Sequence, residues 1–226
     1  MTLTGVHALV FDAYGTLFDV RSVYDAVAPH TQDPGAFITL WRSKQLEYSW
    51  LRTLMDRFVD FEAVSRDALD HAADRFGLEL GETDRQALME SWLRPDPFPD
   101  AEPALRALAG YPRAILSNGS RRMLDRVIEH SGFGPFFDQV IQVISVDDVR
   151  RFKPAPDVYR LVLTALDVRA DDVLFVSANG FDVAGAKSFG FRVAWVNRAN
   201  APLERLGFAP DFRLTSLADL PALVTT

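Results

Sequence analysis

The sequence contains no cysteine, and this absence excludes several kinds of chemistry at once. Disulfide bonds, thiolate metal sites and cysteine nucleophiles are all ruled out. The absence also fits a reducing compartment, so we expect a cytoplasmic location. Long apolar runs are missing as well. Runs such as residues 8–11 have the length of a strand and fall far short of the ~20 residues that span a bilayer.

An excess of positive charge is also missing. The 24 Lys and Arg residues are outnumbered by 31 Asp and Glu residues, which gives a formal net charge of −7. Nucleic acids and anionic membranes need Lys and Arg to neutralise their phosphates, so we expect neither as a partner. Residues 1–5 carry no basic stretch before an apolar run, and we expect no signal peptide. The 48% of apolar residues excludes a mainly disordered chain.

The pattern of apolar residues changes twice along the chain. Residues 6–11 form a buried-strand run that ends at Asp12 and a turn at Gly15. From about residue 19 to 93, apolar residues recur at three- and four-residue steps, which predicts helices and no convincing strand. Residues 94–99 then hold three prolines, which predicts a linker or hinge because proline cannot continue a helix.

Helices and strands alternate after Pro99. We predict helices over residues 102–109, 120–130, 157–166 and 183–189, and strands over residues 113–116, 139–144, 173–176 and 192–196. Such alternation is typical of a parallel sheet covered on both faces. The predicted fold is therefore α/β, with a Rossmann-like core made of residues 1–18 and 99–226 and a helical insertion of residues 19–98.

Polar clusters follow the predicted strands at the edge where open parallel sheets bind ligands. These clusters are residues 12–16, 117–120, 151–154 and 177–182. Asp12 is suited to act as a covalent nucleophile, although a carboxylate that only caps the turn is the alternative. Lys153 offers a positive charge, with a solvated surface lysine as its alternative. Asp182 is the second carboxylate of the set, with a helix cap as its alternative.

Together these clusters resemble the haloacid dehalogenase superfamily. The resemblance is carried by Asp12 and Thr16, by residues 117–119, by Lys153 with Pro154, and by Asp182 after a strand. The helical insertion also follows the first motif, where this superfamily has its cap. The resemblance implies a haloacid dehalogenase-like core with an inserted helical cap.

Two departures distinguish this chain from the phosphatases of that superfamily. Those enzymes usually carry a second Asp two residues after the nucleophile, where this chain has Tyr14. They also carry acidic residues after the fourth strand to hold Mg²⁺, where this chain has Ser177, Ala178 and Asn179. Because Mg²⁺ prefers several carboxylate oxygens, we expect no metal and no other cofactor. A Mg²⁺-dependent phosphatase remains the alternative function.

Longer stretches resemble the L-2-haloacid dehalogenase branch. They comprise residues 11–20, 41–48, 116–120, 153–154 with Tyr159, and 175–182. The resemblance implies that Asp12 attacks the halogen-bearing carbon of a short-chain L-2-haloacid and expels halide. Water then hydrolyses the resulting aspartyl ester and releases a D-2-hydroxy acid, with inversion.

The same resemblance implies roles for the other polar residues. The substrate carboxylate would be held by Ser117 and by the backbone N–H groups of Ala13 and Tyr14. The halide would be bound by Arg42, Asn118 and Phe181. Asp182 would serve as the base for the hydrolytic water, helped by Ser177, Asn179 and Lys153. Thr16, Tyr159 and Phe61 would support the nucleophile or line the pocket, with plain packing as their alternative.

Three other interpretations stay open beside the dehalogenase. Two are the phosphatase and a non-catalytic relative on the same fold. The third is a nicotinamide-binding fold, although the turn after the first strand has one glycine instead of a glycine-rich loop. The family also suggests a homodimer through the cap helices. We expect Arg121 and Arg122 to be a solvated helix start, and the cap to open about residues 18–19 and 95–99.

Overall fold

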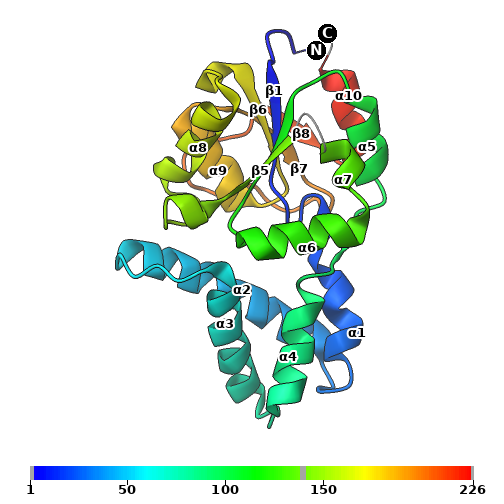
Figure 1. Cartoon of the computed structure of the whole chain (residues 1–226), viewed down its shortest axis with the longest axis vertical. Coiled ribbons are helices and arrows are strands. Elements are labelled where there is room, and N and C mark those ends of the chain that lie inside the picture. The colour runs from blue at the N-terminus through cyan, green and yellow to red at the C-terminus, as the bar shows by residue number, and fades with distance from the viewer. Residues whose placement is uncertain (1–2, 138–140, 225–226) are drawn as a thin grey trace.

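A six-stranded parallel sheet forms the centre of the molecule (Figure 1). The computed structural model describes residues 3–137 and 141–224, and its strands lie in the order β5-β4-β1-β6-β7-β8. Every neighbouring pair is parallel. The strands are β1 (Ala8–Phe11), β4 (Arg113–Ser117), β5 (Ile141–Ser145), β6 (Val173–Ser177), β7 (Arg192–Val196) and β8 (Phe212–Leu214). The predicted α/β fold is confirmed.

Helices cover both faces of this sheet, which explains why its strands read as continuous apolar runs. One face carries α8 (Pro156–Leu166) and α9 (Gly180–Phe189) (Figure 1). The other carries α5 (Ala101–Ala107), α7 (Gly134–Phe137) and α10 (Leu220–Leu223). Helix α6 (Arg121–Ser131) lies at the end of the sheet that faces the remaining helices.

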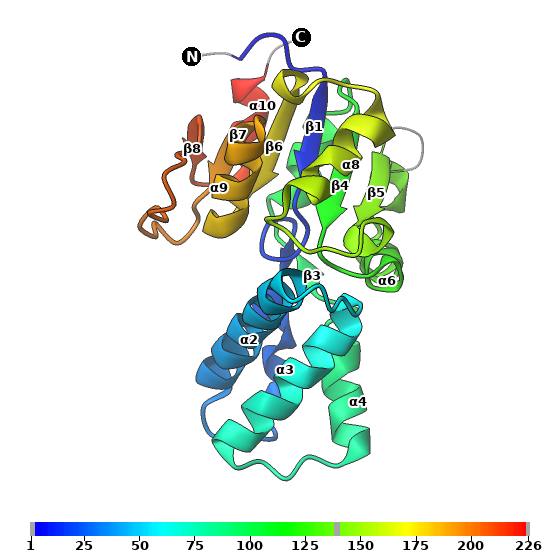
Figure 2. The same ribbon diagram turned by 90° about the vertical axis from the view of Figure 1, so that its left-hand side faces the viewer.

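The remaining helices form a separate layer beyond the carboxyl ends of the strands (Figure 2). They are α1 (Tyr24–Val27), α2 (Pro34–Leu54), α3 (Phe61–Phe76) and α4 (Glu82–Ser91). Asp33 and Asp60 cap the N-termini of α2 and α3 with their side chains. We call residues 19–98 the helical region and the rest of the described chain the sheet region.

The two connections between these regions pair with each other. Strand β2 (Phe18–Asp19) lies antiparallel to β3 (Asp96–Pro97), and the N–H of Phe98 donates to the carbonyl of Leu17 at 2.9 Å. The stretch predicted as a linker or hinge thus joins the two regions and contains a two-residue strand. Proline is tolerated here because a two-residue edge strand needs few backbone N–H donors.

Several predicted boundaries also differ from the structure. Strand β8 was missed because its three residues carry too little apolar pattern to stand out. The helical pattern predicted from about residue 19 to 93 is interrupted after Leu54, where α2 ends, and α3 begins at Phe61. Gln139, the predicted start of the third sheet strand, lies outside the described residues.

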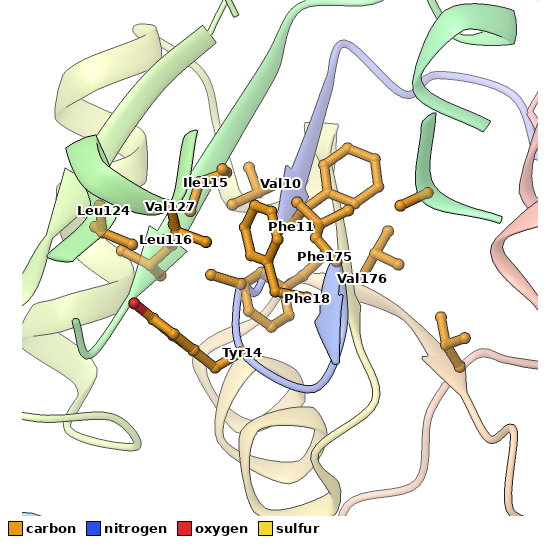
Figure 3. Packing of buried hydrophobic residues seen from close by; sticks show 14 of the residues in the cluster. Val10, Phe11, Tyr14, Phe18, Ile115, Leu116, Leu124, Val127, Phe175 and Val176 are labelled. Atoms are coloured by element: carbon orange, nitrogen blue, oxygen red, sulfur yellow. The ribbon is translucent and has the colours of Figure 1, made fainter. Parts of the chain in front are cut away.

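The apolar core lies between the sheet and its helices. Side chains of β1, β4 and β6 interdigitate there with Leu124 and Val127 of α6 (Figure 3). Phe18 packs into the same core beside Tyr14, with their ring centroids 6.5 Å apart. The loop that follows β1 is thereby anchored by two buried aromatic rings, which hold it against the end of the sheet.

Candidate active site

Asp12 lies at the carboxyl end of β1 and its carboxylate is held by three donors. The Nζ of Lys153 binds Oδ1 at 2.9 Å, while Thr16 Oγ1 and Asn179 Nδ2 bind Oδ2 at 2.8 and 2.7 Å. The chain turns away from the carboxylate through Gly15, whose φ of +88° is unfavourable for other residues. The turn therefore presents Asp12 in one fixed orientation at the edge of the sheet.

Lys153 lies between two carboxylates. Its Nζ is 2.9 Å from Asp12 Oδ1 and 2.8 Å from Asp182 Oδ2, and the lysine side chain is 1% exposed. Burial acts to lower the pKa of Lys153, but the two carboxylates outweigh burial and raise it above its usual value. The ammonium therefore stays charged and offsets the repulsion between the two acids.

Asp182 is fully buried behind Asp12. Its Oδ1 accepts a 2.7 Å hydrogen bond from the hydroxyl of Tyr159, and its Oδ2 lies 3.3 Å from Ser177 Oγ. Burial raises the pKa of Asp182 to about 6, although the charge of Lys153 opposes this. Helix α9 begins at Gly180, three residues before the predicted start, with Asn179 at the N-cap. Asp182 is thus not the cap of that helix, and its carboxylate faces Lys153.

A narrow cavity lies in front of Asp12 and is lined by both regions. The sheet region lines it with Asp12, Tyr14, Ser117, Asn118, Gly119, Lys153, Asn179 and Phe181, and the helical region lines it with Arg42, Leu46 and Phe61. Thr16, Ser177, Tyr159 and Asp182 do not line the cavity, and they lie behind Asp12 as its supporting groups.

Several donors at the cavity have no partner of their own. The backbone N–H groups of Ala13 and Tyr14 donate no hydrogen bond to any residue that the structure describes. Ser117 Oγ accepts the N–H of Gly119 at 3.1 Å, which leaves the hydroxyl proton for another acceptor. Asn118 Oδ1 accepts the N–H of Lys153 at 2.8 Å, which leaves its NH₂ group as the donor. These groups suit an anion.

Arg42 is the cation of the cavity that comes from the helical region. Its Nη1 lies 3.3 Å from Gln45 Oε1, and its guanidinium carbon lies 5.9 Å from the ring of Trp92. Gln45 is fixed in turn by a 3.0 Å hydrogen bond to Ser65 Oγ. Burial lowers the pKa of Arg42 and the charge of Asp12 opposes this, so the arginine remains protonated at neutral pH.

Two aromatic residues shape the cavity walls. The hydroxyl of Tyr14 lies 3.4 Å from the carbonyl of Trp92, and burial raises the pKa of Tyr14. Tyr14 therefore offers no acid or base to a bound substrate. The ring of Phe181 packs edge-on against Trp50 with centroids 5.2 Å apart, so α2 supports this wall from behind.

Leu46 and Gly119 line the cavity but are absent from the predicted site residues. Leu46 lies one helical turn after Arg42, so the four-residue repeat of a helix was a usable signal for it. Gly119 carries no side chain, and its place could be inferred only from its neighbours Ser117 and Asn118.

Arg121 and Arg122 lie exposed at the start of α6, as predicted, but Arg122 also makes contacts that the sequence did not show. Arg122 forms an ion pair with Glu62 of α3, and Ser120 Oγ donates to the same carboxylate at 2.8 Å. A second carboxylate, Glu90 of α4, lies 3.6 Å away. Arg121 instead binds Asp125 and two other groups of the sheet region. Glu62 and Arg122 join the two regions directly beside the cavity.

No three His, Asp or Glu side chains come together as a metal-binding set within residues 3–137 and 141–224. Asp12 and Asp182 are the nearest approach to one, but the ammonium of Lys153 lies between their carboxylates. No helix in the same ranges is long and apolar enough to cross a membrane.

Comparison with known proteins identifies the family. The model of the haloacid dehalogenase-like hydrolases matches residues 6–190. The chain belongs to this family. An (S)-2-haloacid dehalogenase of Xanthobacter autotrophicus is 46% identical over 97% of this chain and 95% of its own length. Another from Pseudomonas sp. (strain YL) is 41% identical over 98% of this chain and 95% of its own length.

Solved structures agree with this assignment. The L-2-haloacid dehalogenase of Xanthobacter autotrophicus superposes with a TM-score of 0.91 at 44% identity, over 96% of this chain and 98% of the other. A structure of the same enzyme with chloropropionic acid covalently bound superposes with a TM-score of 0.90 over the same shares. The resemblance to the L-2-haloacid dehalogenase branch is thus confirmed over nearly the whole chain.

Proposed function

We propose that this hydrolase converts short-chain L-2-haloacids into D-2-hydroxy acids through an ester on Asp12. The observation that carries the proposal is the orientation of the Asp12 carboxylate and the donors around it. It faces the cavity lined by both regions and is oriented by Lys153, Thr16 and Asn179. A carboxylate held this way, among donors suited to anions, fits a nucleophile that attacks an anionic substrate. Covalently bound chloropropionic acid in the Xanthobacter autotrophicus relative supports the same chemistry.

The first step is a displacement at carbon. One oxygen of Asp12 forms a bond to the carbon that carries the halogen, and the carbon–halogen bond breaks from the opposite side with inversion. The halide leaves with the bonding electron pair towards Arg42, Asn118 and Phe181. Substrate and nucleophile are both anions, and two like charges ~4 Å apart repel by about 4 kcal/mol at an effective dielectric of ~20. Lys153 offsets this repulsion from behind Asp12.

Throughout this step the substrate carboxylate is bound by hydrogen-bond donors that have no partner in the described part of the chain. These are the Ser117 hydroxyl and the N–H groups of Ala13 and Tyr14. Phe61 lies 2% exposed at the cavity and forms an apolar wall for the alkyl group of the substrate. Residues 19–98 act as a cap that closes the site against bulk water.

The second step is hydrolysis of the ester. Water attacks the carbonyl carbon of Asp12 and gives up its proton to Asp182, with Ser177 and Asn179 positioning the water. The bond between that carbonyl carbon and the alcohol oxygen breaks, and the oxygen takes up the second proton of the water, which releases the hydroxy acid. Asp12 is restored as a carboxylate, and Asp182 gives its proton to solvent. Tyr159 holds Asp182 in place through its 2.7 Å hydrogen bond.

Release of chloride from L-2-chloropropionate in the presence of EDTA tests this proposal. We expect turnover to D-lactate by the native chain, and none from D-2-chloropropionate. Asp12→Asn keeps the shape of the side chain but removes the nucleophile, so its activity should fall on the order of 10⁴-fold or more. Mg²⁺-dependent release of phosphate from a phosphate ester, without chloride release from any haloacid, would instead establish the phosphatase. Tyr14, and the lack of an acidic residue among Ser177, Ala178 and Asn179, argue against that alternative.

We also propose a homodimer through the helical region, in the cytoplasm. Leu51, Leu54 and Met55 at the end of α2 are 44%, 82% and 59% exposed, which is unusual for large apolar side chains. Analytical ultracentrifugation should give twice the chain mass of 25.3 kDa. Leu54→Glu should shift the protein to the monomer mass.

A further inference from the structure

The backbone carbonyls of the loop after Asp12, residues 13–16, are all hydrogen-bonded within the protein. The carbonyl of Ala13 accepts the N–H groups of Thr16, Leu17 and Phe18. The carbonyl of Tyr14 accepts Asn179 Nδ2 at 3.0 Å. The N–H groups of Ala13 and Tyr14, by contrast, have no partner among the described residues. The orientation of these peptide groups therefore decides which loop groups an anion meets.

A single side chain binds the next two carbonyls of this loop. Nη2 of Arg198 lies 3.1 Å from the carbonyl of Thr16, and its Nη1 lies 3.5 Å from that of Gly15. Thr16 in turn donates its hydroxyl to Asp12 at 2.8 Å and accepts the N–H of Ala178 at 2.9 Å. Arg198 is therefore connected to the carboxylate of Asp12 through one residue, Thr16.

Arg198 is itself fixed by the segment that returns from the helical region. Its Nη2 and Nε lie 2.9 and 3.2 Å from the two oxygens of Asp100, and its guanidinium carbon lies 3.9 Å from the ring centre of Phe98. Asp100 is held in turn by Ser216 Oγ at 2.8 Å and by the N–H of Leu217 at 2.9 Å. A planar guanidinium with five donors can make all these contacts at once, whereas an ammonium cannot.

We infer that Arg198 is a positioning residue for the dehalogenation reaction: it fixes the loop that carries Asp12, and it ties this loop to the connection from the helical region. The inference rests on the proposed function. Arg198 does not line the cavity and does not touch the substrate. Its effect on the reaction passes through the carbonyls of Gly15 and Thr16.

The kinetic test compares Arg198→Met and Arg198→Lys with a matched control, Arg213→Met. Arg213 also stacks on an aromatic ring, that of Trp195 at 4.7 Å, but it is exposed on β8 and makes no contact with the loop. Formation of the Asp12 ester is followed by mass spectrometry in a single turnover with enzyme in excess over L-2-chloropropionate. All rates are expressed per folded molecule, from thermal unfolding curves.

We expect Arg198→Met to slow ester formation on the order of 10²-fold, because misplacing reacting groups by about 1 Å costs that much. Its KM should rise less than the rate falls, by under about tenfold, because the N–H groups of Ala13 and Tyr14 move with the loop while Ser117 stays in place. Arg198→Lys should recover about a tenth of the native rate, since it keeps the charge but loses the planar fork. Arg213→Met should match the native chain within about twofold. An Arg198→Met rate within about twofold of native per folded molecule would overturn the inference.

A second measurement does not depend on activity. Hydrogen–deuterium exchange of the amides of residues 13–18 should become at least about tenfold faster in Arg198→Met and stay unchanged in Arg213→Met. Unchanged exchange in Arg198→Met would also overturn the inference. If the native chain releases no halide while exchange increases as expected, the proposed function fails and the loop-fixing role of Arg198 stands.

Discussion

The two regions that enclose the cavity hold their functional groups in different ways. In the sheet region, three side-chain donors within 2.9 Å fix the carboxylate of Asp12. In the helical region, Arg42 has one 3.3 Å contact to Gln45 and a ring beside it. The sheet region therefore holds the nucleophile in its reactive orientation before substrate binds. The helical region supplies the positive charge of Arg42 and an apolar wall, and its side chains are held less tightly.

Side-chain contacts join the two regions. Glu62 binds Ser120 and Arg122. Thr53 Oγ1 accepts the N–H of Phe152 at 3.0 Å, and Phe58 stacks on Phe152 with centroids 4.9 Å apart. None of these contacts involves a hydrogen-bond partner of Asp12, so we expect the proposed opening of the cap to leave the nucleophile in place.

The largest effect should come from removing the charge in the sheet region. Lys153→Met leaves two buried carboxylates facing each other, and we expect ester formation to slow on the order of 10³-fold. The free energy of unfolding should fall by about 3–5 kcal/mol, because breaking a buried ion pair leaves an uncompensated charge. Single-turnover kinetics and urea unfolding measure the two effects.

The matched control for this substitution is Lys44→Met in the helical region. Lys44 pairs with Glu47 at 2.8 Å at the surface of α2, and its loss should leave activity within about twofold of native. The result that would contradict this role of the sheet region is a Lys153→Met variant with more than about a tenth of the native rate of ester formation. The rate of the control is measured in the same way.

The pH dependence of ester hydrolysis should sharpen the comparison further. Burial raises the pKa of Asp182 to about 6, and the proposed base must be ionised. Hydrolysis should therefore slow as pH falls through about 6, approaching tenfold per pH unit. Tyr159→Phe removes a donor that lowers the pKa of Asp182, so this variant should move the acid limb to higher pH. Decay of the ester between pH 5 and 8 measures both.

Stability should respond to pH in the opposite direction. An unfolded Asp titrates at about 3.9, below the folded value, so the folded state binds more protons in the window between about pH 4 and 6. The contribution of Asp182 to stability therefore increases as pH falls through that window, and Asp182→Asn should remove this contribution.

For the hydrolysis experiment, a rate of ester hydrolysis that stays flat from pH 7 to 5 would argue against Asp182 as the base.

The smallest effect should come from the contact between the two regions. Glu62→Gln removes the ion pair with Arg122 and weakens closure, so KM should rise about three- to fivefold with kcat within about twofold. Glu82→Gln is the control, because Glu82 pairs with Arg66 inside the helical region. Steady-state kinetics at low ionic strength compares them. Equal KM values for the two variants would show that this contact does not hold the cap closed.

The same division decides what the sequence could predict. Strands β1, β4, β6 and β7 were predicted directly from apolar runs, and Asp12, Lys153 and Asp182 were predicted from the polar clusters at the strand ends. Arg42 and Phe61 were predicted only from the resemblance to a family, because a local helical pattern does not show which face of a helix meets a distant sheet. The pair of Glu62 with Arg122 and the contact of Arg198 with Gly15 join residues 60 and 183 positions apart. No local pattern encodes such contacts.

The central claim is that an ester on Asp12 is formed and then hydrolysed at the Asp12 carbonyl carbon. A single turnover of L-2-chloropropionate in water enriched in ¹⁸O, with enzyme in excess, tests it most directly. The account predicts unlabelled D-lactate and one ¹⁸O atom in the Asp12 carboxylate, seen by mass spectrometry of the peptide. Labelled lactate with an unlabelled Asp12 would show that water attacks the substrate itself, and would contradict the account.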